Sequence, residues 1–330
     1  MSHAVLLLSS EALSLAYPGP VLERLRSMAE TLQIYSPAET WKQHPEGLRR
    51  ADVIFSGWGA PRMDDEFFRH APNVRVIFYA AGSIRYFLTD AVWRRGVRIT
   101  TAQSLNAVPV AEFAAASLLL GLKRVWHYAR ATRESRGFPV DRPMPGAYQS
   151  TVGLVSYGTI ARLVRERLRA LDVKVVVFDP YLSHDVARAE EVTPVSLDEV
   201  FTLSDAVSVH TPYLPETEGL IRGRHLDRLR PGSFFLNTAR GEVIHEGEMI
   251  EVLRRRTDLQ AMLDVTAPEP PPTHSPLYQL PNVVLTPHIA GSMGAECERM
   301  GMAMVDEWVR YRAGQPMRWE ITADRASLSA

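Results

Sequence analysis

Short apolar runs alternate with amphipathic segments along most of this chain. Before residue 103, the apolar runs occupy residues 4–9, 31–35, 52–57, 74–80 and 97–101. Between them, apolar positions recur at helical spacing near residues 20–30, 39–50, 64–70 and 85–95. Alternating β and α elements predict a parallel sheet with helices on both of its faces. Residues 1–102 are therefore predicted to form a first α/β domain.

The same alternation starts again at residue 151. Apolar runs that predict strands occupy residues 152–155, 174–179, 206–210, 233–237, 260–265 and 283–287. Helical patterns lie near residues 159–171, 196–204, 223–229 and 245–257. Strands joined by helical crossovers are what a doubly wound sheet needs. Residues 292–313 predict a last helix, and residues 314–330 a tail.

The segment between the two alternating regions predicts a buried helix followed by a loop. Residues 104–130 are apolar nearly all round, which is typical of a helix packed between domains or subunits. Pro109 suits the first turn of such a helix. Residues 131–150 are rich in Pro, Gly and Arg and predict a long loop or linker.

Composition narrows the function classes. At 330 residues, with 46% hydrophobic and 23% charged residues, the chain is expected to hold about two globular domains. A net charge of −1 gives no reason to expect a nucleic-acid or membrane partner. Cys297 is the only cysteine, so no disulfide can form within the chain, and a reducing cytoplasm is expected. No apolar run is expected to reach transmembrane length, and nothing in the sequence predicts a metal site.

The strand–turn–helix–strand pattern at residues 151–181 is typical of a dinucleotide-binding βαβ unit. Its G-x-G-x-x-G frame falls on Ser156, Gly158 and Ala161, so one glycine of the three remains. Ser156 occupies a position that needs a positive φ, at a cost of about 1 kcal/mol. We therefore keep open the possibility that cofactor binding is weakened.

Asp179 ends the second strand of this unit, 23 residues after Ser156. A carboxylate at that point can accept both ribose hydroxyls of adenosine, and it repels a 2′-phosphate. This favours NAD over NADP. The alternative is an aspartate that only caps the turn before Pro180.

Four other polar residues follow predicted strands, where ligands bind in sheets of this type. Arg240 could grip a carboxylate in bidentate fashion, and His288 with a nearby carboxylate makes an acid–base pair near neutral pH. Asp264 ends a strand, and Glu269 follows it in a proline-rich stretch. Taken alone, Arg240 and Glu269 would be better interpreted as surface charges, and His288 could cap the following helix.

Together these residues resemble the D-isomer-specific 2-hydroxyacid dehydrogenase family. The resemblance covers nearly the whole chain and rests on residues 106–113, 151–161, 177–181, 208–221, 236–244, 263–272 and 280–291. It implies two Rossmann-like domains with an active-site cleft between them. The NAD-binding domain would span residues 103–292, and the substrate domain would combine residues 1–102 and 293–330. Members of the family are usually homodimers.

The resemblance also implies a role for each candidate residue. Arg240 would bind the substrate carboxylate and polarise the 2-oxo carbonyl. His288 would donate a proton to the carbonyl oxygen as hydride arrives from NADH, and Glu269 would hydrogen-bond His288 and keep it protonated. Asp264 would hold the nicotinamide carboxamide and orient the catalytic groups.

Further residues are implied for binding. Backbone groups at Ala81 and Gly82 would bind the substrate carboxylate, in a pocket that includes Trp58. The cofactor residues would be Ser156, Tyr157, Gly158, Thr159, Ile160, Asp179, Thr211, Pro212, Thr238 and Asp264.

Two positions sharpen the expected activity. Glu269 stands where formate dehydrogenases typically carry Gln, which argues against a formate dehydrogenase. Trp58 lies near the position where phosphoglycerate dehydrogenases usually carry Arg, which disfavours a phosphorylated substrate. We expect an NAD(H)-dependent oxidoreductase that interconverts a small or apolar D-2-hydroxy acid and its 2-oxo acid. The alternative is an NAD-sensing binding protein on the same fold, like the family's corepressors, with little or no turnover.

Overall fold

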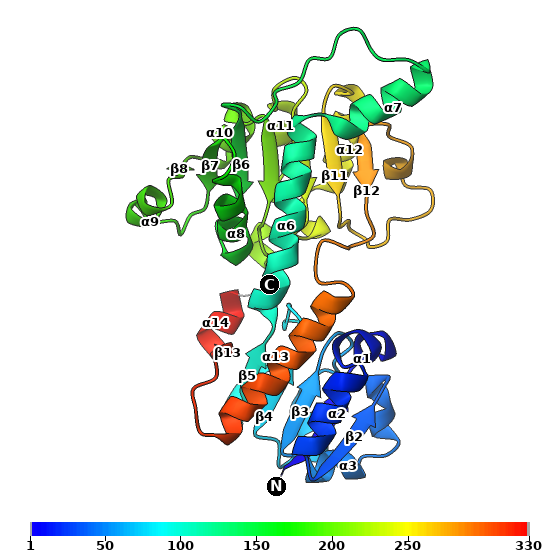
Figure 1. Ribbon diagram of the computed structural model, residues 1–330, viewed down its shortest axis with the longest axis vertical. Coiled ribbons are helices and arrows are strands. Elements are labelled where there is room, and N and C mark those ends of the chain that lie inside the picture. Colours follow the sequence, from blue (N-terminus) through cyan, green and yellow to red (C-terminus); the bar gives the residue numbers. More distant parts are fainter. Residues whose placement is uncertain (1, 329–330) are drawn as a thin grey trace. The chain divides into compact units, whose positions relative to one another are not determined.

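The computed structural model describes residues 2–328, and the chain divides into two compact units (Figure 1). Unit 1 comprises Met1–Ala107 and Ser292–Ala330, and unit 2 comprises Val108–Gly291. The sequence places these boundaries at 102/103 and 292/293. The division between Ala107 and Val108 falls inside a helix, α6 (Gln103–Leu122).

Unit 1 is built on a six-stranded sheet in the order β13-β5-β4-β3-β1-β2. Its strands are β1 (His3–Leu7), β2 (Thr31–Tyr35), β3 (Val53–Ser56), β4 (Val76–Tyr79), β5 (Arg98–Thr101) and β13 (Glu320–Ile321). All neighbours pair in parallel except β13 with β5. The strand order reverses between β1 and β3, which is the topological switch point of this sheet.

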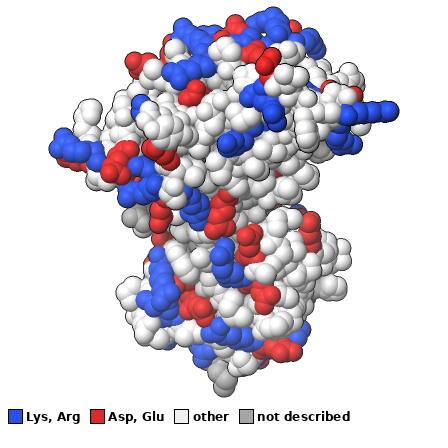
Figure 2. Space-filling view, turned by 45° about the horizontal axis from the view of Figure 1, so that its top comes forward, with Lys and Arg blue, Asp and Glu red and all other residues white. Residues whose placement is uncertain are grey.

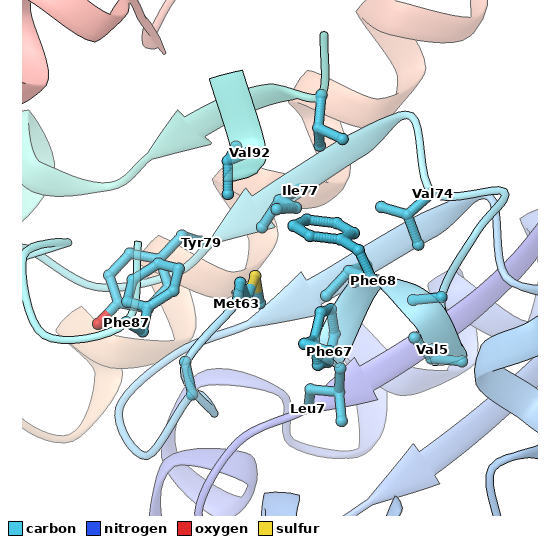
Figure 3. Close-up of a cluster of buried hydrophobic side chains, with 14 of the residues drawn as sticks. Val5, Leu7, Met63, Phe67, Phe68, Val74, Ile77, Tyr79, Phe87 and Val92 are labelled. Carbon is cyan, nitrogen blue, oxygen red and sulfur yellow. The ribbon is translucent and has the colours of Figure 1, made fainter. Parts of the chain in front are cut away.

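Helices cover both faces of the unit 1 sheet. They are α1 (Ser10–Ala16), α2 (Gly19–Met28), α3 (Glu46–Arg50), α4 (Asp65–His70), α5 (Asp90–Arg94), α13 (Ala295–Arg312) and α14 (Ala323–Leu328), with a 3-10 helix at Ala38–Lys42. Successive side chains of a strand point to opposite faces of the sheet, so alternate residues pack into two separate hydrophobic cores. Figure 3 shows part of one core, where Met63, Ile77, Tyr79 and Phe87 pack together.

Three expectations for unit 1 are corrected. The helix predicted at 85–95 begins only at Asp90, where the side chain of Thr89 accepts a hydrogen bond from the Ala91 N–H. Helix α1 was not predicted, because its apolar positions continue directly from the first strand. The 314–330 tail contains β13, which Arg98 holds through a paired hydrogen bond to Glu320, and α14.

Unit 2 contains a seven-stranded parallel sheet in the order β12-β11-β10-β9-β6-β7-β8. Its strands are β6 (Thr151–Val155), β7 (Lys174–Phe178), β8 (Thr193–Pro194), β9 (Ala206–Val209), β10 (Phe234–Asn237), β11 (Gln260–Leu263) and β12 (Val283–Leu285). The short edge strand β8 adds to the six predicted strands. The order reverses between β6 and β9. The predicted fold class, α/β with two parallel-sheet domains, is confirmed.

The helices of unit 2 also pack on both sheet faces. Besides α6 they are α7 (Val125–Ser135), α8 (Thr159–Leu168), α9 (His184–Ala189), α10 (Leu197–Leu203), α11 (Gly223–Asp227) and α12 (Glu246–Arg255). Three 3-10 helices lie at Pro215–Thr217, Gly241–Val243 and Pro276–Tyr278. The helix α9 was not predicted.

The long apolar helix differs from its prediction at both ends. It begins at Gln103, so Pro109 lies inside α6 rather than in its first turn. It stops at Leu122, because Arg124 adopts a left-handed conformation with φ of 52°, and α7 then extends to Ser135. The predicted 131–150 loop therefore begins only at residue 136.

The expectation that no apolar run reaches transmembrane length was wrong for α6. By length and composition, α6 could cross a membrane, and half of its apolar window is buried in the structure. Its residues Ala111, Ala114 and Leu118 lie in the core cluster beside the sheet. A core helix passes the same test, so length and composition do not separate the two cases.

Candidate active and cofactor sites

The turn after β6 lies at the switch point of the unit 2 sheet. Because β6 and β9 are neighbours, the turn that follows β6 meets the residues that follow β9. The Ser156 hydroxyl lies 2.9 Å from the Thr211 hydroxyl, and the Ser156 N–H donates to the Phe178 carbonyl at 2.7 Å. Ser156 has a φ of 70°, the left-handed conformation that a glycine adopts without strain. Its side chain thus joins the ends of two strands.

The N-terminus of α8 follows this turn and can receive an anion. Gly158 precedes the helix, and no side chain caps the free N–H groups of its first turn, which Thr159 and Ile160 begin. A Cβ added at Gly158 would meet no atom within 4 Å, so the space in front of these donors is open. Free N–H groups and the helix dipole together favour a phosphate at such a point. The residues present therefore fit the pyrophosphate of a dinucleotide.

Asp179 lies at the end of β7, beside the same turn. One carboxylate oxygen accepts the Tyr157 N–H at 2.6 Å, and the other accepts the Tyr181 N–H at 2.7 Å. Each oxygen keeps a further lone pair, because a carboxylate has about four acceptor positions. Asp179 thus fixes the turn and can still accept ribose hydroxyls.

Tyr157 contributes only its backbone to this turn. Its side chain is buried, its hydroxyl donates to the Glu190 carboxylate at 2.6 Å, and Arg162 lies over its ring at 5.0 Å. Burial raises the pKa of the Tyr157 hydroxyl, so it stays neutral near pH 7. The side chain therefore stabilises the unit from within and does not face the cofactor turn.

Sequence reasoning missed His210, which follows β9 directly and precedes Thr211-Pro212. Burial lowers the pKa of His210 to about 4, so the ring is neutral at pH 7. Its Nε2 atom has no hydrogen-bond partner among the described residues, and neither has the buried Thr238 hydroxyl. The sequence does carry a signal for His210. It is the last residue of the predicted strand 206–210, and ligands bind at the ends of strands in such sheets.

The loop after β10 carries Arg240. The Asn237 side chain braces this loop, donating to the Arg240 carbonyl at 2.9 Å and accepting the Ala239 N–H at 3.0 Å. The guanidinium donates to the Ala239 carbonyl at 2.6 Å. Burial lowers the pKa of the Arg240 guanidinium, while the charges of Glu242 and Glu269 act in the opposite direction. Arg240 therefore lies close enough to Glu269 for their charges to interact.

Gly241 allows two loops of this site to meet. A Cβ added at Gly241 would lie 2.1 Å from the carbonyl carbon of Thr266 and 2.5 Å from the Ala267 nitrogen. No side chain fits between these backbones. The loop that carries Arg240 can therefore lie directly against the loop that carries Glu269.

Glu269 and His288 form the central pair. Glu269 Oε1 lies 2.6 Å from His288 Nδ1, and the side chains are 42% and 47% exposed. With the carboxylate ionised, Nδ1 carries a proton and donates it to this bond. The other ring nitrogen, Nε2, is then left to exchange a proton with a ligand.

Asp264 fixes the loop that carries His288. One oxygen accepts the Thr286 hydroxyl at 2.6 Å and the Ile289 N–H at 2.9 Å, and the other accepts the Ala290 N–H at 2.9 Å. Asp264 is only 2% exposed, so these donors replace the water that its charge loses on burial. His288 itself has a φ of 53°, a conformation that this loop enforces.

The remaining candidates belong to unit 1. Trp58 follows β3, and Ala81 and Gly82 follow β4, so all three lie at the carboxyl ends of neighbouring strands. The Trp58 carbonyl accepts the Ser9 N–H at 2.8 Å, which joins this loop to the end of β1. Ala81 is buried, and Gly82 and Trp58 are partly exposed. Trp58 thus lies beside the switch point of the unit 1 sheet, and Ala81 and Gly82 lie at the end of the next strand.

The chain is similar to known proteins along most of its length. The profile of the D-isomer-specific 2-hydroxyacid dehydrogenase NAD-binding domain matches residues 115–290. A D-3-phosphoglycerate dehydrogenase of Archaeoglobus fulgidus is 29% identical over 257 residues, which are 78% of this chain and 49% of that protein. A glyoxylate reductase of Thermofilum pendens is 32% identical over 251 residues, which are 72% of either chain. A crystal structure of a Thermus thermophilus protein, 29% identical, covers 97% of this chain and 100% of its own with a TM-score of 0.78.

The chain belongs to the D-isomer-specific 2-hydroxyacid dehydrogenase family. It is thus a member of a family of NAD-binding oxidoreductases, as the strand-end residues predicted. The chain spans about half the length of the phosphoglycerate dehydrogenases that it matches, at 48% to 49%.

Replacing Asp264 with Ala should loosen the loop that carries His288 in this dehydrogenase-family protein. Three donors would lose a buried acceptor, at about 1–3 kcal/mol for each donor left unsatisfied. We expect the amides of Ile289 and Ala290 to exchange with deuterium at least about tenfold faster. Asp258→Ala is the matched control, because Asp258 binds Arg256 and the Gly232 N–H instead. Unchanged exchange in Asp264→Ala would show that Asp264 does not fix this loop.

Proposed function

We propose that the protein is an NAD(H)-dependent oxidoreductase that interconverts a D-2-hydroxy acid and its 2-oxo acid. The observation that carries this proposal is the 2.6 Å hydrogen bond between Glu269 and His288, because the loop that carries Glu269 lies against the loop that carries the partly buried Arg240. An imidazole that can donate a proton and a guanidinium at the same sheet edge suit a substrate that presents a carbonyl next to a carboxylate. Family membership supports the same reaction class.

Arg240 binds and polarises the substrate in this proposal. Its side chain is partly buried, so water screens its charge less than at the open surface, and that charge can act on a carboxylate or a polarised carbonyl. The single bond to the Ala239 carbonyl leaves further N–H donors for a bidentate contact. Arg240 thus orients the 2-oxo acid and stabilises negative charge that develops on its carbonyl oxygen.

His288 moves the proton. When bound, NADH supplies a hydride to the substrate carbonyl carbon, and NAD⁺ accepts it in the reverse direction. His288 Nε2 donates a proton to the carbonyl oxygen during reduction and takes one from the hydroxyl during oxidation. A 2-oxo acid, NADH and one proton thus give a 2-hydroxy acid and NAD⁺. Glu269 holds the ring orientation and balances its charge in the protonated form.

The cofactor residues lie at the switch point of unit 2. The first-turn N–H groups of α8 hold the pyrophosphate, and Asp179 accepts the adenosine ribose hydroxyls. The buried Thr238 hydroxyl, which has no partner among the described residues, would be free to hydrogen-bond the cofactor. Asp264 would hold the carboxamide through its one remaining acceptor position. Asp179 repels a 2′-phosphate, so we propose NAD as the cofactor.

Unit 1 supplies the substrate-side contacts in this proposal. The N–H groups that follow β4, at Ala81 and Gly82, bind the substrate carboxylate, and Trp58 lies at the end of the neighbouring strand β3. Residues 1–102 and 293–330 thereby act as the substrate domain and residues 103–292 as the cofactor domain. Basic and acidic side chains are interspersed over the face that Figure 2 shows, which suits a small-molecule substrate better than a nucleic acid.

We also propose that two copies of the chain associate. Unit 2 exposes apolar side chains on α6, α7 and the following loop, namely Leu120, Val125, Phe138, Val140, Met144 and Tyr148. Exposed apolar groups of this extent are typical of a subunit interface. Analytical ultracentrifugation tests this: a dimer mass is expected, and Phe138→Glu with Val140→Glu should shift it to the monomer. A monomer mass for the unaltered protein contradicts the proposal.

The buried, unpaired Cys297 is consistent with a cytoplasmic protein.

A substrate panel tests the reaction. Purified protein with NADH should reduce at least one of glyoxylate, hydroxypyruvate, pyruvate and branched or aromatic 2-oxo acids, measured as loss of NADH absorbance. His288→Asn should lower kcat by about a hundredfold or more, because general acid catalysis contributes that much. NADH affinity should remain within about twofold, because His288 moves the proton and does not hold the cofactor.

The matched control for that variant is His274→Asn, which changes an exposed histidine on the nearby proline-rich loop. It should turn over normally. Tight NADH binding without turnover of any 2-oxo acid contradicts the enzymatic proposal and favours an NAD-sensing binding protein. Equal kcat in His288→Asn and the unaltered protein removes His288 from the mechanism.

Asp179→Asn should relax the cofactor preference. The amide can keep one of the two backbone hydrogen bonds, but it carries no charge to repel a 2′-phosphate. We expect the ratio of kcat/KM for NADH over NADPH to fall about tenfold, equivalent to about 1.4 kcal/mol. Asp185→Asn, on the surface of α9, is the control and should leave the ratio unchanged. A preference for NADPH in the unaltered protein would falsify the assignment of NAD.

A further inference from the structure

We propose that Tyr86 is a specificity-determining residue, whose ring packs against an aromatic or other large apolar side chain of the 2-oxo acid. The inference rests on the proposed function and names the substrate class for the same site. It comes from the way that the Tyr86 ring is fixed at the carboxyl ends of β3 and β4.

Two hydrogen bonds hold the hydroxyl of Tyr86. It donates to the Gly57 carbonyl at 3.2 Å and lies 2.9 Å from the hydroxyl of the buried Tyr79. With its proton on Gly57, the Tyr86 oxygen accepts the proton of Tyr79. Burial raises the pKa of Tyr86, so the hydroxyl stays neutral near pH 7. Both of its hydrogen-bonding roles are therefore filled from within unit 1.

The ring of Tyr86 is held as well as its hydroxyl. It meets the buried Phe87 ring edge-to-face at a centroid distance of 5.2 Å, and Phe87 packs in turn on Tyr79 at 4.6 Å. Figure 3 shows Tyr79 and Phe87 overlapping at one end of the core. Tyr86 nevertheless remains 49% exposed. A rigid aromatic surface is thus presented to solvent, at little further cost in side-chain entropy when a ligand covers it.

This aromatic surface lies where unit 1 is expected to bind a ligand. In a parallel α/β sheet, ligands bind outside the carboxyl ends of the strands, at the switch point. In unit 1 that point lies between β1 and β3, and Trp58 follows β3 there. The bond from Tyr86 to Gly57 joins the residue directly to the loop that carries Trp58. Tyr86 and Trp58 therefore border the region where Ala81 and Gly82 would hold the substrate carboxylate.

The exposed part of the Tyr86 side chain determines which substrates it favours. Because the hydroxyl is occupied, the free part of Tyr86 is its carbon ring. Aromatic pairs gain about 0.5–1.5 kcal/mol beyond the burial of their area. A phenyl group on the substrate would gain that contact, whereas glyoxylate has no side chain to place there. We therefore infer phenylpyruvate and similar aromatic or bulky 2-oxo acids as the preferred substrate class.

Variants at Tyr86 test the inference. The unaltered enzyme should prefer phenylpyruvate over glyoxylate in kcat/KM. Tyr86→Ala should lower kcat/KM for phenylpyruvate about tenfold, mainly through KM, and change that for glyoxylate by less than about twofold. Tyr86→Phe keeps the ring and should stay near the unaltered value. Tyr278→Ala removes another half-exposed tyrosine, in unit 2, and serves as the control.

A binding measurement separates this inference from the proposed reaction. Phenylpyruvate titrated into the complex with NAD⁺ cannot react, so calorimetry reports the contact alone. We expect Tyr86→Ala to bind about tenfold more weakly than the unaltered protein, even if no turnover is found. Equal affinity in both proteins overturns the inference, as does an equal loss with both substrates or a preference for phosphohydroxypyruvate. The proposed reaction fails only in the turnover panel.

Discussion

The placement of His288 depends on one buried carboxylate. Asp264 lies at the end of β11 and accepts three hydrogen bonds from residues 286–290. A buried charge is costly unless donors replace its water, so the segment can fold only in a form that supplies them. That form gives His288 its left-handed backbone and turns its ring toward Glu269. The hydrogen bond between Glu269 and His288 is thus set by the fold.

The neighbouring loops are positioned by the same sheet edge. Gly241 lets the Arg240 loop touch the backbone at Thr266, which precedes the Glu269 stretch. Each of these loops follows a strand of one parallel sheet, so their ends meet at one edge. The cofactor turn belongs to that edge too, where the Ser156 and Thr211 hydroxyls join β6 to β9. The groups proposed for anion binding, proton transfer and charge stabilisation therefore share one scaffold.

The sequence predicted what local patterns determine. The strand runs and the α/β class follow from the periodicity of apolar residues. The motif and the strand runs together predicted that Arg240, Asp264, Glu269 and His288 follow strands. Features set by tertiary contacts were missed: the break at Arg124, the edge strand β13, and the inward direction of the Tyr157 side chain. The Tyr86 anchor was also invisible, because its partner Gly57 lies far away in sequence and offers only a carbonyl. A hydrogen bond to a backbone carbonyl cannot be predicted from the pattern of side chains along the sequence.

The most direct test of the acid–base assignment is the structure of the complex with NADH and oxamate, an unreactive analogue of a 2-oxo acid. The decisive measurement is the distance from His288 Nε2 to the analogue's carbonyl oxygen. We predict about 2.6–3.2 Å, the range for productive proton transfer, with the carboxylate on Arg240. An oxamate bound away from His288, with the Glu269–His288 bond intact, would contradict the account.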